Sequence, residues 1–182
     1  MAKVESRMQL QRGDSAPIFE LPGIDGRGHA LAECAGKSGV LVIFMCNHCP
    51  YVKARMAEIV ALHREYGDSV AFVGINASDP AYPGESFQDM KDFAEAYGME
   101  FPYLVDANGD LAKAYGATCT PDPFLFDADQ RLVFHGRISD ALEPGDTPSE
   151  HTMKENIEKL LRGEEIEKWF NPSLGCSIKF KN

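Results

Sequence analysis

The chain has 182 residues, 44% of them hydrophobic, with 18 basic and 28 acidic side chains and a formal net charge of −10. This composition predicts one soluble globular domain over residues 1–182 and excludes a largely disordered chain. An acidic chain without a basic stripe is also a poor partner for nucleic acid. No apolar run has the length of a signal peptide core or of a membrane span, so we expect no membrane partner and a cytoplasmic location.

The first half of the chain alternates predicted strands and helices. Two short apolar runs around a glycine-rich turn predict an N-terminal hairpin: residues 16–21 and 29–31. The apolar run at 40–45 suits a strand that is buried on both faces. Apolar residues then recur at helical spacing from Pro50 to Tyr66, and a second buried strand follows at 70–75. This order predicts a parallel, right-handed βαβ unit.

The second half predicts helices and a further hairpin. Residues 87–97 and 111–115 have helical patterns that end at glycines. Residues 124–126 and 132–134 flank turn residues, which predicts an antiparallel hairpin on the edge of the parallel sheet and hence a mixed sheet. A threonine and proline at 147–148 predict the start of a last helix. We expect a core over residues 13–162 and a C-terminal tail over 163–182.

Two cysteines three positions apart lie at the predicted junction of strand and helix. If the helix starts near Asn47, Cys46 lies at its N-terminus and Cys49 in its first turn. Unpaired N–H groups of the helix start favour a thiolate, so Cys46 is predicted to be the more acidic thiol. The spacing brings both sulfurs within bonding reach. His48 between them is either a charge that stabilises the thiolate or a solvated loop residue.

Two other interpretations of this pair stay open. The cysteines could be core thiols, or half of a zinc site completed by two further ligands. Only Cys119, Cys176 and scattered histidines are available for that purpose, so we expect no metal and no cofactor. The odd total of five cysteines is unlike a secreted disulfide framework, and Cys34 receives no role.

With the motif Cys46-Asn47-His48-Cys49 and the later Thr120-Pro121, the sequence resembles the thioredoxin superfamily over residues 13–162. The resemblance implies an α/β thioredoxin-like fold, with a central mixed sheet flanked by helices. It also implies that Pro121 is a cis-proline facing the dithiol. A cis-proline lacks an N–H donor and exposes the preceding backbone to an extended substrate.

Within the superfamily the chain is similar to the peroxiredoxin-like redoxin group, which is related to alkyl hydroperoxide reductase and thiol-specific antioxidant proteins. In that alignment Cys49 takes the place of the peroxidatic cysteine. The proline and threonine that peroxiredoxins carry before it are replaced by Val42 and Cys46. Arg55 and Arg137 are candidates to supply the missing donors.

The thioredoxin pattern also differs, because its buried acid is Val40 here and its tryptophan is Met45. The sequence therefore shows no obvious carboxylate base for proton transfer from Cys49. Cys119, two residues before Pro121, is either a third redox sulfur or a packing residue. Cys176 lies in GCSIKF, an ending that the resemblance shares, and is either a resolving thiol or part of the packing of the tail.

The leading prediction is a thiol–disulfide oxidoreductase in which Cys46 attacks, Cys49 resolves and the backbone at Thr120-Pro121 positions the substrate. The alternative is a thiol peroxidase that reduces hydroperoxides through a sulfenic acid on Cys49. A metal-binding or redox-sensing module is the third interpretation. The expected partners are protein or small-molecule disulfides, or hydroperoxides, together with an unidentified electron donor.

Overall fold

A computed structural model describes residues 3–181. Its centre is a six-stranded mixed sheet in which the strand order is β10-β9-β8-β4-β5-β6. The strands of this sheet are β4 (Gly39–Phe44), β5 (Val70–Asn76), β6 (Tyr103–Val105), β8 (Asp122–Asp127), β9 (Leu132–Gly136) and β10 (Phe170–Asn171). The predicted α/β class and mixed sheet are confirmed.

The strand β4 is the centre of this sheet. It pairs in parallel with β5, and the crossover between them is α1 (Pro50–Tyr66), so the predicted βαβ unit is confirmed. Its other neighbour is β8, which runs antiparallel to it. The hairpin β8–β9 lies along the β4 edge of the parallel strands, so its predicted place is confirmed. Beyond this hairpin, a strand from the C-terminal segment, β10, pairs with β9 and forms the outer edge of the mixed sheet.

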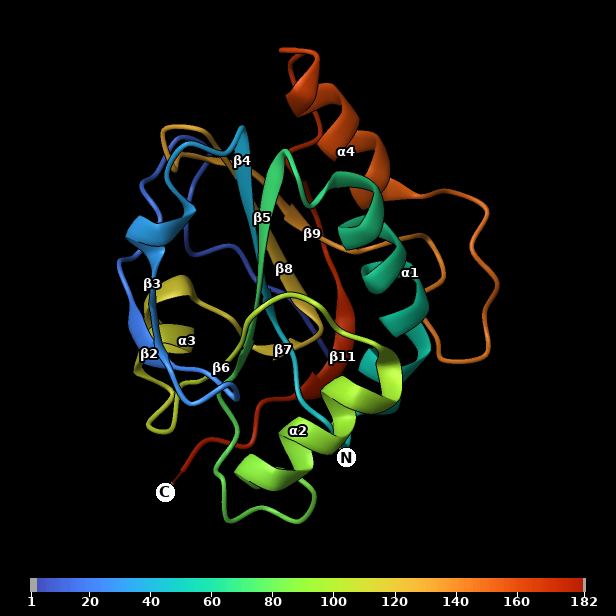
Figure 1. Cartoon of the computed structure of the whole chain (residues 1–182). Helices are drawn as coiled ribbons and strands as arrows, with labels where there is room; N and C mark the ends of the chain where they lie inside the picture. The colour runs from blue at the N-terminus through green and yellow to red at the C-terminus, as the bar shows by residue number, and fades with distance from the viewer. Residues whose placement is uncertain (1–2, 182) are drawn as a thin grey trace.

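Helices cover both faces of the sheet (Figure 1). Along β4, Leu41 and Ile43 belong to the core under α1, α2 (Phe87–Tyr97) and α4 (Thr152–Leu161). The alternate residues Val40 and Val42 belong to the opposite core. That second core is covered by α3 (Asp110–Tyr115), the short helix η1 (Leu31–Cys34) and the N-terminal hairpin β2 (Glu20–Pro22)/β3 (Gly28–Ala30). Burial on both faces explains why the whole strand is apolar.

The last helix starts later than the sequence pattern predicts. Its first residue is Thr152, not a residue next to Thr147. The reason is Asp140, whose carboxylate accepts the backbone N–H groups of Ser149 and Glu150 at 2.8 and 2.9 Å. These contacts hold the preceding segment in a loop. Within residues 3–181, no helix combines the length and apolarity that crossing a bilayer requires.

The C-terminal segment is built into the fold and is not a peripheral tail. After β10 it forms β11 (Leu174–Ser177), the middle strand of a second, three-stranded sheet. Its neighbours are β1 (Lys3–Glu5) and β7 (Cys119–Thr120), both antiparallel to it. Figure 1 shows this last strand running beside β7 and the start of α1. Residues from both ends of the chain therefore meet at the cysteine motif.

Candidate active site

The two cysteines of the motif lie between the end of β4 and the start of α1. The helix begins at Pro50, and Cys49 is its N-cap residue, with φ −70° and ψ 120°. The expectation that the helix starts near Asn47 is therefore wrong, because proline takes the first helical position and Cys46 lies outside the helix. Both side chains are buried, with 1% of Cys46 and 0% of Cys49 exposed.

The Thr120-Pro121 pair faces these two sulfurs. The Thr120–Pro121 peptide bond is cis, as predicted. The Cys49 sulfur lies 3.3 Å from the Thr120 carbonyl oxygen. The Cys46 sulfur lies 3.2 Å from the Thr120 hydroxyl oxygen. The fold thus joins two motifs that are more than seventy positions apart in sequence.

Cys49, not Cys46, is the more acidic thiol. Hydrogen bonding from the Cys46 thiol is the largest cause that lowers the pKa of Cys49 to about 5, and the Cys176 thiol and the Val52 N–H add to it. The pKa of Cys46 is raised well above its usual value by that same contact, by burial and by the nearby Glu85 carboxylate. The predicted order is thereby reversed. The physical reason is that the Cys46 and Cys176 thiols and the Val52 N–H of the helix start all hydrogen-bond to the Cys49 sulfur and stabilise its thiolate.

This difference predicts the pH dependence of the reduced protein. Because a thiol with a pKa of about 5 is ionised above that pH, the ultraviolet absorbance of thiolate should rise through a midpoint near pH 5. The step should be present in Cys34→Ser and absent in Cys49→Ser. A step near pH 5 that survives in Cys49→Ser and disappears in Cys46→Ser would contradict the assignment.

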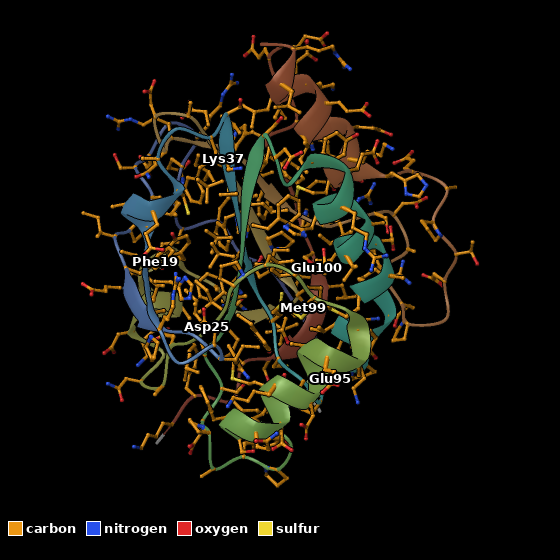
Figure 2. All side chains as sticks on the ribbon, in the orientation of Figure 1. Phe19, Asp25, Lys37, Glu95, Met99 and Glu100 are labelled. Carbon is orange, nitrogen blue, oxygen red and sulfur yellow. The ribbon has the colours of Figure 1, made fainter. Side chains whose placement is uncertain are left out.

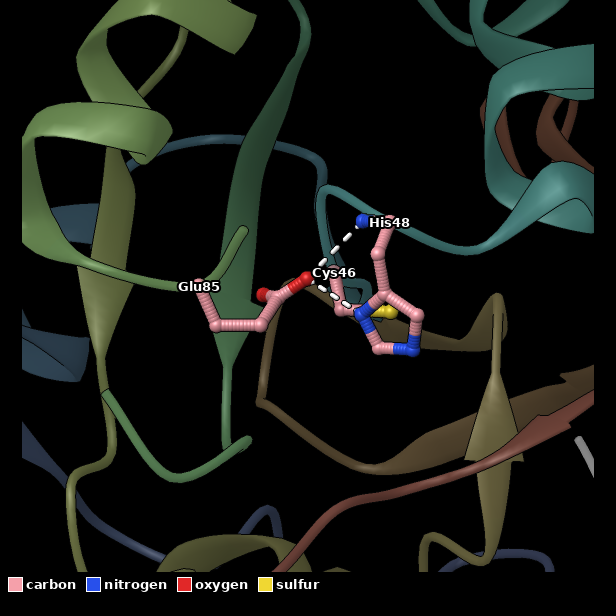
Figure 3. A group of neighbouring side chains, drawn as sticks. All are labelled: Cys46, His48 and Glu85. Atoms are coloured by element: carbon pink, nitrogen blue, oxygen red, sulfur yellow. Dashed lines mark hydrogen bonds and ion pairs between the residues drawn. The ribbon is translucent and has the colours of Figure 1, made fainter. Parts of the chain in front are cut away.

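A buried carboxylate completes the site, and the sequence patterns did not indicate it. The Glu85 side chain is 0% exposed and comes from the segment before α2. It accepts the backbone N–H groups of Asn47 at 2.9 Å and His48 at 2.8 Å, and the Asn76 amide at 2.6 Å. The His48 Nδ1 lies 2.5 Å from the same carboxylate, and a dashed line marks this contact in Figure 3. The carboxylate lies beside Cys46, whereas the prediction that Cys49 has no carboxylate base concerns the other cysteine.

His48 is fixed in place and is not a solvated loop residue. Its side chain is 13% exposed, and its ring packs on Tyr82 with centroids 4.8 Å apart. Donor atoms of Cys46, His48 and Glu85 all lie within 4.8 Å of one another (Figure 3). Three such groups can contact a cation, but a structural zinc site needs four ligands. Among residues 3–181, neither Cys119 nor Cys176 joins this group.

The other three cysteines differ in their surroundings. Cys119 is fully buried, its sulfur lies 3.9 Å from the Pro121 carbonyl oxygen, and burial raises the pKa of its thiol. Cys176 is opposite Thr120 in the pairing of β11 with β7, and its thiol faces Cys49. Cys34 belongs to the core on the far face of the sheet. Of the three, Cys176 is the one whose thiol lies against the dithiol.

Neither candidate arginine stands in for the donors of a peroxiredoxin. The guanidinium of Arg55 pairs with Glu58 at 2.6 Å and donates to the Asp146 carbonyl at 3.2 Å. Arg137 donates to Thr152 at 3.1 Å and to Glu150 at 3.0 Å. Both guanidinium groups are thus held by partners outside the cysteine motif.

Residues 12–135, more than half of the chain, match the family model described as AhpC/TSA family. The chain belongs to the AhpC/TSA family. The resemblance to the redoxin group within the thioredoxin superfamily is thereby confirmed.

Curated relatives of this AhpC/TSA protein include the thiol-disulfide oxidoreductase ResA of Geobacillus thermodenitrificans, 29% identical over 123 residues, with 66% of each chain covered. The thioredoxin-like protein YneN of Bacillus subtilis is 30% identical over 118 residues, with 65% of this chain and 66% of YneN covered. The chain thus spans slightly less than two thirds of the length of these relatives.

Solved structures extend the likeness over the whole AhpC/TSA chain. An uncharacterized conserved protein from Geobacillus kaustophilus is 39% identical with a TM-score of 0.93, and 100% of this chain and 97% of that chain are covered. A hypothetical protein from Sinorhizobium meliloti is 36% identical with a TM-score of 0.91, with 97% and 98% covered. Peroxidoxin BcpB from Mycobacterium tuberculosis, 21% identical with a TM-score of 0.61 over 85% of this chain and 96% of that chain, shares the fold.

Proposed function

We propose that this AhpC/TSA protein is a thiol–disulfide oxidoreductase that works through the Cys46/Cys49 dithiol. The observation that carries the proposal is the contact of an acidic N-cap cysteine with a second thiol and with the backbone before a cis-proline. The names of the curated relatives ResA and YneN support it. The cysteine content supports a reducing compartment, and we extend the proposal to a cytoplasmic location.

The geometry supports an order of attack that differs from the sequence prediction. The Cys49 thiolate attacks one sulfur of a substrate disulfide, whose other sulfur leaves as a thiolate. The mixed disulfide on Cys49 is then attacked by Cys46, which must first lose its proton. Glu85, paired with His48, is the nearby group suited to accept that proton. The products are the reduced substrate and a Cys46–Cys49 disulfide, which a thiol donor reduces.

The peroxidase alternative has less support. The acidic Cys49 matches the position of a peroxidatic cysteine, but the threonine that would assist it is replaced by Cys46. The arginines considered for its place are held elsewhere. Disulfides are therefore the proposed substrates, and the electron donor is a dithiol of undetermined identity.

Reduction of insulin with dithiothreitol as donor tests the proposed function. We expect the wild type and Cys34→Ser to accelerate precipitation of the insulin chains equally, because Cys34 lies on the far face of the sheet. Cys49→Ser should lose this activity because it lacks the nucleophile, and Cys46→Ser combined with Cys176→Ser should lose it because no thiol remains beside Cys49 to resolve the mixed disulfide. Insulin reduction at the wild-type rate by Cys49→Ser would refute the assignment.

A further inference from the structure

The strand β11 occupies the place where an extended substrate would bind. The backbone before a cis-proline is an open edge to which a peptide can add as a strand. Here that edge, at Cys119 and Thr120, is already paired antiparallel with Ser177 and Cys176 of β11. The other side of β11 is paired with β1, so the added strand is itself covered. The C-terminal segment of the chain therefore occupies the edge to which a substrate would bind.

The fit of this strand to the cis-proline is close. A Cβ atom added at Gly175 would lie 1.9 Å from the Thr120 carbonyl oxygen, so any larger residue there must displace the strand. The Ser173 hydroxyl donates to the Pro121 carbonyl oxygen over 2.6 Å. The Ser173 backbone N–H donates to the Ser6 hydroxyl over 2.8 Å. Through Ser173, these contacts attach the start of β11 to the loop at Pro121 and to Ser6 near the N-terminus.

The strand brings one cysteine to the dithiol. Cys176 lies directly opposite Thr120 in the pairing register, and Thr120 is the residue whose carbonyl contacts the Cys49 sulfur. Both the thiol and the backbone N–H of Cys176 face the Cys49 sulfur. Cys176 is 2% exposed, so its place beside Cys49 is inside the protein. A cysteine of a bound substrate strand would occupy this same place in a mixed disulfide.

We infer that Cys176 is a third redox residue, which β11 presents to the dithiol as an internal substrate and which exchanges with the Cys46–Cys49 disulfide. This inference rests on the proposed function. In the exchange, the Cys176 sulfur attacks the Cys49 sulfur, the Cys46–Cys49 bond breaks and a Cys49–Cys176 bond forms. The proton of Cys176 ends on the released Cys46 thiolate, and no electrons enter or leave the protein.

Mapping the disulfides of the full chain tests the inference. The reduced protein is oxidised with a stoichiometric amount of diamide, free thiols are blocked in acid, and the digest is analysed by mass spectrometry. We expect two products in the wild type and in Cys34→Ser: an internal disulfide within the 46–49 peptide, and a cross-link between that peptide and the peptide containing Cys176. The cross-link should be lost in Gly175→Ala, which displaces β11 and with it Cys176, although all five cysteines remain in the sequence.

If Gly175→Ala does not fold, the variant Cys176→Ser still tests the inference, because it only replaces one sulfur atom by oxygen. It should lose the cross-link and keep the Cys46–Cys49 disulfide. If the wild type forms only the Cys46–Cys49 disulfide, the inference is overturned and the proposed function stands. If the wild type forms no Cys46–Cys49 disulfide, the proposed function fails together with the inference.

Discussion

Replacing Glu85 by glutamine should lower the free energy of unfolding by about 3 kcal/mol, because each buried donor left without an acceptor costs about 1–3 kcal/mol. The carboxylate is fully buried and accepts N–H groups from Asn47, His48 and Asn76. A glutamine has one acceptor oxygen, and its amide group would point N–H donors at other donors. Urea unfolding at neutral pH measures the difference.

The matched control is Glu95→Gln, an exposed residue of α2 that is labelled in Figure 2. A substitution on an exposed helix face should change the free energy of unfolding by no more than about 0.5 kcal/mol. The Glu85 variant should also resolve mixed disulfides more slowly, since Cys46 loses its proton acceptor. Equal stability of the two variants would show that Glu85 does not hold the cysteine loop.

The central part of the fold could be predicted because its signals are local. The continuous apolar run of β4 and the helical spacing of α1 identify a βαβ unit without any knowledge of distant contacts. The cysteine motif and the Thr120-Pro121 motif then predict that the segment after β4 lies next to the loop at Pro121. The start of α1 was placed too early, although Pro50 is itself a signal of the first helical position.

The parts that could not be predicted depend on contacts between distant residues. Glu85 lies in a segment without a regular pattern, and only the fold brings it to Asn47, nearly forty positions earlier. The strand β11 has four residues and no alternation, because its neighbours β1 and β7 determine its pairing. The low pKa of Cys49 depends first on hydrogen bonding from the Cys46 thiol, and then on Cys176 and on the Val52 N–H at the observed helix start.

The second large effect concerns which cysteine forms the mixed disulfide. An attacking thiol must be ionised, and at neutral pH the thiol with a pKa of about 5 is Cys49. Cys46→Ser should therefore accumulate a mixed disulfide on Cys49, because the resolving thiol is gone. Cys49→Ser should form almost none, since the pKa of the remaining Cys46 is raised. Both variants are made together with Cys176→Ser, so that Cys176 cannot release the adduct.

The most direct test of this mechanism is the mass of each reduced variant after brief incubation with oxidised glutathione and quenching in acid. We expect a single glutathione adduct in the Cys46→Ser variant, located at Cys49 by peptide mapping, and no adduct at Cys46 in the Cys49→Ser variant. An adduct at Cys46 in Cys49→Ser, with Cys49 unmodified in Cys46→Ser, would contradict the account and restore Cys46 as the attacking residue.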